Sequence, residues 1–418
     1  MTPSRIVFLL LAVIVTAAVA TAATLRAGAH ATDITPITFP APINGGMKGA
    51  SSSTVRDPMH ARSLVIESGG VALVLCIVDA CMIPREICVE AKRIAARATG
   101  IAESRMLISA THAHSCATMT AVFQSDPDPA YVARVPTLIA DSIIRAHANL
   151  ERAEIAWGAD RDPTQVFNRR WLVKEGESYE NPFDSKADRA WMNPGYQNPK
   201  VTGSAGPVDD EVALLAVRAA EGGRPIALLA NYSLHYVGGV PAISADYFAA
   251  FAREMAVRLG TGDGRYAGKP AFMGAMSNGT SGDINNVNYG RSTPLPRPAP
   301  GEQVEVVARS VADAALRAWA RLEWRSAVRL ASAERDVLLA VRKADAGELA
   351  RARRLVETSP RDREGQFSDR KAIYAREALL LDDYPERVPV ALQAHRIGDL
   401  TIAAIPCEVF VEIGLRSL

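Results

Sequence analysis

Residues 62–79 read RSLVIESGGVALVLCIVD, and this stretch decides the expected fold class. Two apolar runs rich in β-branched residues flank the Gly-Gly pair at 69–70, a pattern that predicts strands at 62–67 and 71–79 joined by a tight turn. A helix should follow, because Pro84 suits the first position of a helix. Strands and helices that alternate in this way indicate a mixed α/β or α+β domain.

The same alternation continues through the rest of the chain. Further strands are expected at 106–111, 211–219, 225–235, 388–397 and 400–406, and helices at 84–97, 130–150, 245–259, 302–319, 339–357 and 369–379. Two long stretches, 161–208 and 279–300, have no predicted element, and loops of that length in a compact domain are usually functional or disordered. We therefore expect one large domain of layered sheets and helices.

The N-terminus predicts export. Arg5 precedes an uncharged apolar run at 6–19, and small residues at 20–23 offer a site for a signal peptidase. We expect a signal peptide at 1–23 and a secreted or periplasmic mature chain at 24–418, with retention of the apolar run as a membrane anchor as the alternative. The net charge of +1 gives no reason to expect a nucleic acid as partner.

Two histidines follow the predicted strand at 106–111. In extended backbone, residues i and i+2 point to one face, so His112 and His114 can reach one point in space. Imidazoles at the polar end of a buried strand are costly to leave unpaired, and a metal ion or a substrate anion would satisfy them. A hydrogen-bonded structural pair remains open, because a single H-x-H motif is a weak signal.

Two more polar side chains follow apolar strands in the same manner. His235 comes after the apolar run at 226–230, and Glu408 follows the strand that ends near Pro406. Two histidines and one carboxylate form a known ligand set for catalytic zinc, with one position left open for water. Taken singly, His235 could be a satisfied core histidine and Glu408 a helix cap.

A Gly- and Asn-rich loop at 277–286 follows a strand-like segment at 271–276. Loops of this composition can present backbone amides to an oxyanion, and a plain turn-rich loop is the simpler interpretation. The sequence alone does not decide between the two.

Together these motifs resemble the neutral, non-lysosomal ceramidase family, from about Arg26 to the end of the chain. The matching segments are 27–36 (the family's opening strand), 109–115 (its first zinc motif), 167–170 (its Asn-Arg step) and 405–409 (its Pro-Gly-Glu segment). The resemblance implies a secreted zinc-dependent hydrolase of linear amides, which cleaves ceramide or a related N-acyl lipid with metal-activated water. Such a lipid substrate would bring contact with a membrane surface.

The resemblance also implies roles for single residues. The zinc ligands would be His112, His235 and Glu408, and the groups that stabilise the oxyanion would be His114 and Arg169. The implied substrate-binding residues lie in the loop at 277–286 and are Asn278, Asp283 and Asn285.

The sequence departs from the family at several positions. Asn285 stands where the family has a serine, and Cys407 replaces the glycine before the glutamate. The family's tyrosine ligand and its C-terminal immunoglobulin-like domain have no counterpart up to Leu418, which favours a catalytic domain truncated at its C-terminus. Two alternatives stay open: a degenerate lipid- or glycan-binding protein on the same fold, and another metal-dependent hydrolase, such as a TIM barrel, that uses the H-x-H site with His235 and His395.

Overall fold

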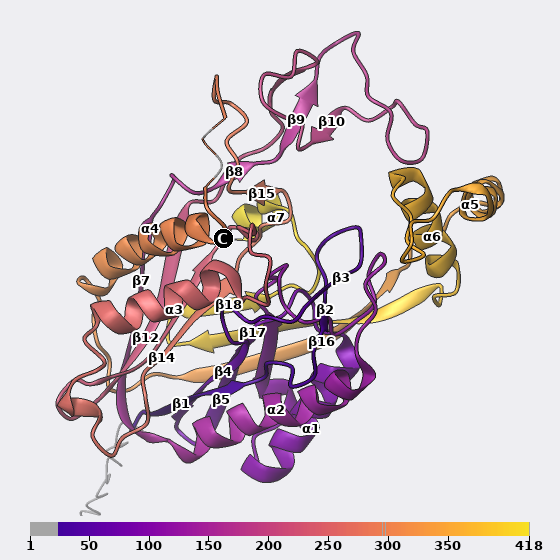
Figure 1. Cartoon of the computed structure of the whole chain (residues 1–418). Coiled ribbons are helices and arrows are strands. Elements are labelled where there is room, and N and C mark those ends of the chain that lie inside the picture. The colour runs from indigo at the N-terminus through magenta and orange to yellow at the C-terminus, as the bar shows by residue number, and fades with distance from the viewer. Residues whose placement is uncertain (1–23, 295, 297, 418) are drawn as a thin grey trace, which may run out of the picture.

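The computed structural model describes residues 24–294, 296 and 298–417, so the predicted signal peptide lies outside the described residues. Its centre is a sheet of eight strands in the order β14-β13-β12-β7-β1-β4-β5-β6 (Figure 1). Their bounds are β1 Arg26–Asp33, β4 His60–Ser68, β5 Val71–Val78, β6 Met106–Ala110, β7 Glu151–Arg161, β12 Glu211–Ala219, β13 Pro225–Tyr232 and β14 Met273–Asn278. Every pairing is antiparallel except β5–β6 and β13–β14.

The large sheet is covered on both faces, which explains the continuous apolar runs of the opening stretch. Along β4 and β5, Val65 and Val74 face the helices, whereas Leu64 and Leu73 face the other way. Strands buried on both faces read as unbroken hydrophobic runs because both side-chain sets leave water. The hairpin predicted from residues 62–79 is therefore confirmed, with its turn at the predicted glycines.

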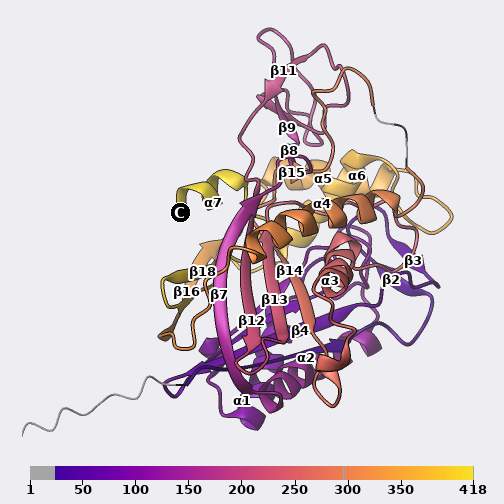
Figure 2. The same cartoon turned by 90° about the vertical axis from the view of Figure 1, so that its left-hand side faces the viewer.

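Four helices pack on one face, namely α1 Arg85–Thr99, α2 Pro129–Ala148, α3 Asp246–Arg258 and α4 Glu302–Trp319. A three-stranded sheet covers the other face with strands β16 Leu330–Ala340, β17 Arg387–Ile397 and β18 Leu400–Ala404. The result is three layers, seen edge-on in Figure 2. Among the described residues, no helix combines the length and apolar composition needed to span a membrane.

Most predicted elements are confirmed, but the helix expected at 339–357 is wrong at its start. β16 continues to Ala340 because it pairs with β17 over its whole length, and α5 begins only at Ala346 and runs to Thr358. Asp345 caps that helix in a capping box with Glu348, whose side chain returns to the backbone of Asp345. The sequence analysis also missed β7 and β16 altogether.

The unassigned stretch at 161–208 forms a small insertion beside the main sheet. Its strands are β8 Phe167–Asn168, β9 Arg170–Val173, β10 Ala190–Met192 and β11 Val201–Ser204, and β8 pairs with β15 Ile284–Asn285 from the second unassigned loop. The remaining elements are β2 Ala41–Ile43, β3 Ala50–Ser52, α6 Arg370–Asp382, α7 Val411–Ser417 and the 3₁₀ turns Glu103–Arg105 and Gly264–Tyr266. Asp184 of the insertion pairs with Arg351 of α5 and Lys371 of α6.

The central sheet curls strongly. β14, at one edge of the strand order, contacts β4, β5 and β6 near the other edge. This curl brings the chain segments after β6 and after β13 to the same region. The predominance of antiparallel pairings and the absence of a βα repeat among the described strands make the TIM-barrel alternative wrong.

Candidate metal centre

His112 and His114 come together, but not through the extended backbone that the sequence suggested. β6 ends at Ala110, and the backbone N–H groups of Thr111 and His112 continue the parallel pairing by donating to Val78 and Ala80 (3.0 and 2.8 Å). His112 then adopts a left-handed conformation with φ 65°. A non-glycine residue in that region is uncommon and concentrates at functional sites, because the surrounding structure must compensate its strain.

Four side chains from distant parts of the chain meet at this point. His235 is buried in the loop after β13, and Glu408 lies in the loop between β18 and α7. The Glu408 Oε1 atom lies 3.4 Å from His235 Nε2 and 3.9 Å from His112 Nε2. His114 Nε2 lies 3.1 Å from His112 Nε2. The structure thus brings together all three residues of the predicted ligand set, with His114 beside them.

The second nitrogen of each imidazole identifies its tautomer. The Nδ1 atoms of His112, His114 and His235 lie 2.7, 3.0 and 3.0 Å from the carbonyl oxygens of Cys81, Gly45 and Ser281, respectively. A carbonyl oxygen only accepts hydrogen bonds, so each Nδ1 carries the hydrogen and each neutral ring presents a lone pair on Nε2. Backbone carbonyls are common partners of metal-bound histidines for this reason.

These lone pairs make the cluster a fit for a metal cation. The ligand atoms of His112, His235 and Glu408 all lie within 4.8 Å of one another, and every one of them is an acceptor in the neutral tautomers. Acceptors that face each other without a shared hydrogen repel, so the arrangement needs a proton or a metal ion between them. Imidazole nitrogens and a carboxylate are the donor types that zinc binds.

The pKa values show where positive charge is favoured. Burial alone would lower the pKa of His112, but hydrogen bonds to Cys81 and Glu408 raise it to about 10. Burial and the neighbouring His112 lower the pKa of His114 to about 2, and burial and Arg169 lower that of His235 to about 3. Burial would raise the pKa of Glu408, but His112 and His235 bring it down to about 2. Without a metal ion, the charged form is therefore favoured only for His112, whereas His114 and His235 are favoured as neutral rings.

Arg169 joins the centre from the insertion. It lies between β8 and β9, and its backbone N–H donates to Asp283 O (2.8 Å). Its Nη2 atom donates to Glu408 Oε1 (3.0 Å) and to Gly282 O. Its Nε atom is buried and has no partner among the described residues. The guanidinium thus orients Glu408 while part of its donor capacity remains unused.

The three predicted substrate-binding residues differ in their surroundings. Asp283 is fully buried and accepts hydrogen bonds from Asn168 Nδ2 (2.9 Å) and the backbone N–H of Val411 (3.0 Å). It therefore has no face for a substrate, and we assign it a supporting role that ties β8 to α7. Asn285 donates to Asn193 Oδ1 (3.1 Å), and the Oδ1 atom of Asn278 is buried without a partner among the described residues.

The Gly-rich loop at 277–286 packs against the Glu408 segment. Gly282 N–H donates to Val409 O (2.8 Å), and a Cβ atom at Gly282 would meet Glu408 O at 2.6 Å. Close approach of the two backbones explains this glycine. The loop thus positions a predicted metal ligand, a role that neither interpretation of its composition included.

Comparison with known proteins finds two solved structures with a similar fold. No family model matches the chain, and no curated protein sequence matches it. Among solved structures, neutral ceramidase from Pseudomonas aeruginosa is 17% identical with a TM-score of 0.65, over 94% of this chain and 64% of that one. A ceramidase complexed with C2 is 16% identical with a TM-score of 0.65, over 94% of this chain and 65% of that one.

The chain has the neutral ceramidase fold. It spans just under two thirds of the length of the two ceramidases. The predicted resemblance and the predicted fold class, a single large domain of layered sheets and helices, are confirmed.

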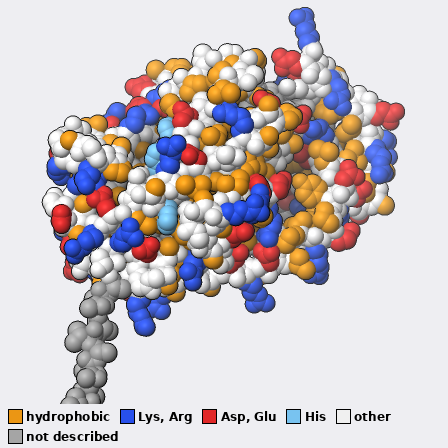
Figure 3. Space-filling model, turned by 90° about the horizontal axis from the view of Figure 1, so that it is seen from below, with side chains coloured by type: hydrophobic (Ala, Val, Ile, Leu, Met, Phe, Trp, Pro, Cys, Tyr) orange, Lys and Arg blue, Asp and Glu red, His pale blue; other side chains and the backbone are white. Residues whose placement is uncertain are grey.

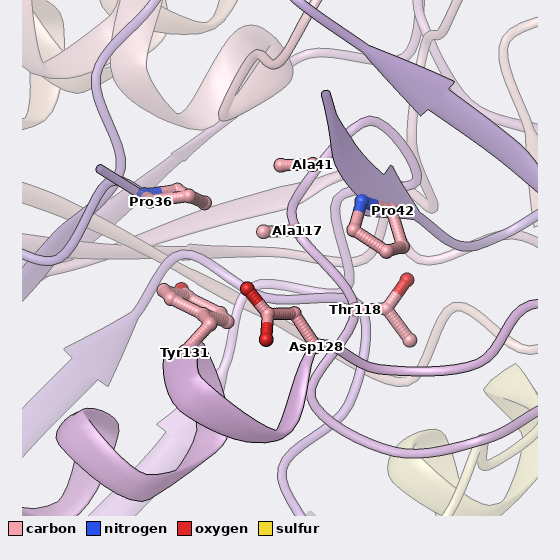
Figure 4. Close-up of a pocket in the computed structure, with 7 residues that line it drawn as sticks. All are labelled: Pro36, Ala41, Pro42, Ala117, Thr118, Asp128 and Tyr131. Atoms are coloured by element: carbon pink, nitrogen blue, oxygen red, sulfur yellow. The ribbon is translucent and has the colours of Figure 1, made fainter. Parts of the chain in front are cut away.

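Two hollows of this ceramidase fold lie outside the ligand cluster. One, which has no room for a water molecule, lies between β2 and the start of α2 and is lined by Pro36, Ala41, Pro42, Ala117, Thr118, Asp128 and Tyr131 (Figure 4). None of the predicted site residues lines it, and Asp128 there serves as the cap of α2. The other, of about 360 Å³, lies between the insertion and the loop around Tyr289.

The larger cavity is formed in part by the insertion that also carries Arg169. It is lined by Trp171, Gly195, Gln197, Asn198, Val201, Tyr289, Gly290, Arg291 and Ser292. Trp171 follows Arg169 by two residues, and the Tyr289 hydroxyl lies 3.3 Å from Asn193 Oδ1, the atom that also accepts from Asn285. Sequence reasoning missed this cavity because its wall comes from the two stretches without predicted elements.

Tyr236 is the other residue that the sequence analysis missed. Its ring stacks on His114 with a centroid distance of 3.7 Å and an interplanar angle of 13°. Its position directly after His235 was a signal that could have drawn attention to it. The carbonyls of Gly45, Cys81 and Ser281 had no comparable signal, because a backbone oxygen is present at every residue.

Proposed function

We propose that this chain is a zinc-dependent hydrolase that cleaves the N-acyl amide bond of a lipid such as ceramide. One observation carries the proposal: the ligand atoms of His112, His235 and Glu408 lie within 4.8 Å of one another, and both imidazoles have Nδ1 bonded to a backbone carbonyl. The likeness of the fold to two solved ceramidases supports the reaction class and a ceramide-like substrate.

His112, His235 and Glu408 would hold the zinc ion through Nε2, Nε2 and Oε1. When bound, zinc supplies Lewis acidity, which lowers the pKa of a water molecule toward 7 and polarises a carbonyl oxygen. The carbonyls of Cys81 and Ser281 keep the two ligating rings in the required tautomer. Arg169 holds Glu408 in place from the side of the insertion.

His114 suits orientation of the attacking water better than the oxyanion role implied by the resemblance. Its Nδ1–H is occupied by Gly45 O, so the neutral ring offers only an acceptor at Nε2. Such a ring can accept a hydrogen bond from the attacking water and hold it in line with the carbonyl carbon. Arg169 is then the remaining side chain for the oxyanion, a role in which one well-placed donor is worth roughly 3 kcal/mol.

The larger cavity would take the polar part of the substrate. Its lining combines the rings of Trp171 and Tyr289 with the amides of Gln197 and Asn198. We also propose contact with a membrane surface, from which an N-acyl lipid would be drawn. A nucleic acid partner is not proposed, because the net charge is +1 and the face in Figure 3 intersperses acidic and basic side chains.

The test measures metal content and hydrolysis on the purified mature chain. We expect one zinc ion per chain by elemental analysis and release of fatty acid from an N-acylsphingosine in detergent micelles. His112→Ala should lose both, whereas His147→Ala on α2, a matched control, should keep both. Wild-type protein that contains no metal after zinc dialysis would contradict the proposal. Binding of the lipid without hydrolysis would favour the degenerate binding protein instead.

We further propose that the chain is exported from the cell, on the basis of the residues at 1–23. N-terminal sequencing of protein recovered from the medium or periplasm should begin near residue 24. Recovery of the intact N-terminus in a membrane fraction would instead support the anchor alternative.

A further inference from the structure

His114 sits in a layered packing arrangement that the proposed chemistry does not by itself explain. The Tyr236 ring covers one side of the imidazole at 3.7 Å, nearly parallel to it. Gly45 also packs tightly against His114, since a Cβ atom at Gly45 would lie 2.4 Å from His114 Cβ. Gly238 lies against the Tyr236 ring, where a Cβ atom would meet Cε2 at 2.9 Å. Both glycines have positive φ, 121° and 74°, which other residues rarely adopt.

The backbone that carries Tyr236 is held by a buried polar network. The fully buried carboxylate of Asp246 accepts hydrogen bonds from the N–H groups of Val237 and Gly238 (3.0 and 2.8 Å). Asp246 N–H in turn donates to Ser244 Oγ (3.0 Å), and Ser244 Oγ donates to Asp57. Burial raises the pKa of Asp246, so these two N–H donors and that of Tyr247 matter for keeping it charged.

The same loop is tied to the backbone of the histidine motif. Ser244 N–H donates to Ser115 O (3.0 Å), and Ser115 follows His114 directly. Tyr236 and His114 are therefore connected twice, once through their stacked rings and once through the loop at 236–246. Neither connection involves a side chain that ligates the proposed ion.

We propose that Tyr236 is a positioning residue, whose ring sets the plane of the His114 imidazole and thereby the direction of its Nε2 lone pair. This inference rests on the proposed function, in which the Nε2 lone pair of His114 orients the attacking water. The hydrogen bond from His114 Nδ1 to Gly45 O would by itself let the ring tilt about the Nδ1–O axis, and a flat neighbour restricts this tilt. Aromatic pairs prefer defined relative orientations, so the stack favours one orientation of the imidazole.

The aromatic ring and not the hydroxyl performs this role. No hydrogen bond joins the Tyr236 hydroxyl to any of the described residues, so the conservative variant Tyr236→Phe should keep the stack intact. Tyr236→Leu keeps an apolar side chain but has no flat face. The two variants therefore separate the role of the aromatic ring from hydroxyl chemistry.

The experiment compares Tyr236→Phe, Tyr236→Leu and the exposed control Tyr384→Leu in the zinc-loaded mature chain. Tyr236→Phe and the control should keep kcat within about twofold. Tyr236→Leu should lower kcat roughly tenfold to a hundredfold, in line with the cost of a small misplacement of a reacting group. Its KM and its zinc content should not change, because the proposed ligands are untouched.

A second measurement does not depend on turnover. The Nδ1–H proton of His114, identified by its absence in His114→Ala, should give a downfield NMR signal in the wild type and in Tyr236→Phe. In Tyr236→Leu the signal should broaden through faster exchange with water. An unchanged signal and kcat in Tyr236→Leu would overturn the inference, as would equal losses in both variants. If no amide is hydrolysed, the proposed function fails while the NMR comparison still decides the stacking.

Discussion

Two buried histidines, His235 and His395, follow similar sequence patterns and have opposite surroundings. Burial lowers the pKa of both, to about 3 and about 4. His235 donates to Ser281 O and faces Glu408 at 3.4 Å. His395 lies on β17 between the two sheets, and neither of its ring nitrogens has a partner among the described residues. A perturbed buried histidine thus indicates a site only where other donor groups converge on it.

The largest expected effect comes from replacing His235, with replacement of His395 in a second variant as the comparison. His235→Ala should lose bound zinc and reduce hydrolysis by more than about a hundredfold, since even the loss of a group that only supports a metal ligand costs roughly 10–100-fold. His395→Leu should keep the full zinc content and kcat. Elemental analysis and N-acylsphingosine hydrolysis measure both variants. Loss of metal from His395→Leu would contradict the conclusion that His235, and not His395, belongs to the metal site.

Arg169 sharpens the comparison, because only the His235 region receives a cation from the insertion. Arg169→Ala should lower kcat roughly a hundredfold through loss of an oxyanion donor. Zinc content should fall only slightly, since Arg169 orients Glu408 without being a ligand. Arg170→Ala, its neighbour, offers a matched control: Arg170 lies over the Phe410 ring and 3.5 Å from Asp283. An equal loss in both variants would point to a general disruption of the insertion.

His395 predicts a pH dependence of stability. Lys92 of α1 adds to the effect of burial in lowering its pKa, and Glu334 of β16 opposes it. The unfolded chain therefore binds a proton near pH 6.5, whereas the folded chain does so only near pH 4. Stability should be full above pH 6.5 and fall by roughly 3 kcal/mol as the pH drops to 4.

Urea unfolding of the wild type and His395→Leu at several pH values measures this dependence. The variant should lose the part of the slope between pH 6.5 and 4 that belongs to His395. Identical slopes in the two proteins would mean that His395 finds a hydrogen-bond partner in solution.

The smallest expected effect concerns the backbone just before Glu408. Cys407 has φ 114°, a conformation that favours glycine. Cys407→Gly should relieve this strain and raise the free energy of unfolding by about 1 kcal/mol, after the entropy cost of glycine is subtracted. Cys407→Ala keeps the strain and is the matched control. A destabilised glycine variant would show that the Cys407 side chain contributes to packing.

Much of the fold was predictable because its signals are local. The Gly-Gly turn, the proline before α1 and the apolar runs identified β4, β5, α1 and β6 within one or two residues. β16 escaped prediction because most of it is exposed and its middle, 334–336, is charged, so that only pairing with β17 keeps it extended. The insertion escaped because its short strands carry no hydrophobic period of their own.

The sequence by itself determined the hydrophobic layers and the polar residues that follow the ends of buried strands, since burial pattern and turn chemistry act over a few neighbouring residues. Only the tertiary structure decided that His112 and His235 meet, because that depends on the curl of the eight-stranded sheet. It also decided the tautomers, through carbonyls of Gly45, Cys81 and Ser281. Every residue has a backbone carbonyl, so no residue type in the sequence indicates which carbonyls will accept these hydrogen bonds.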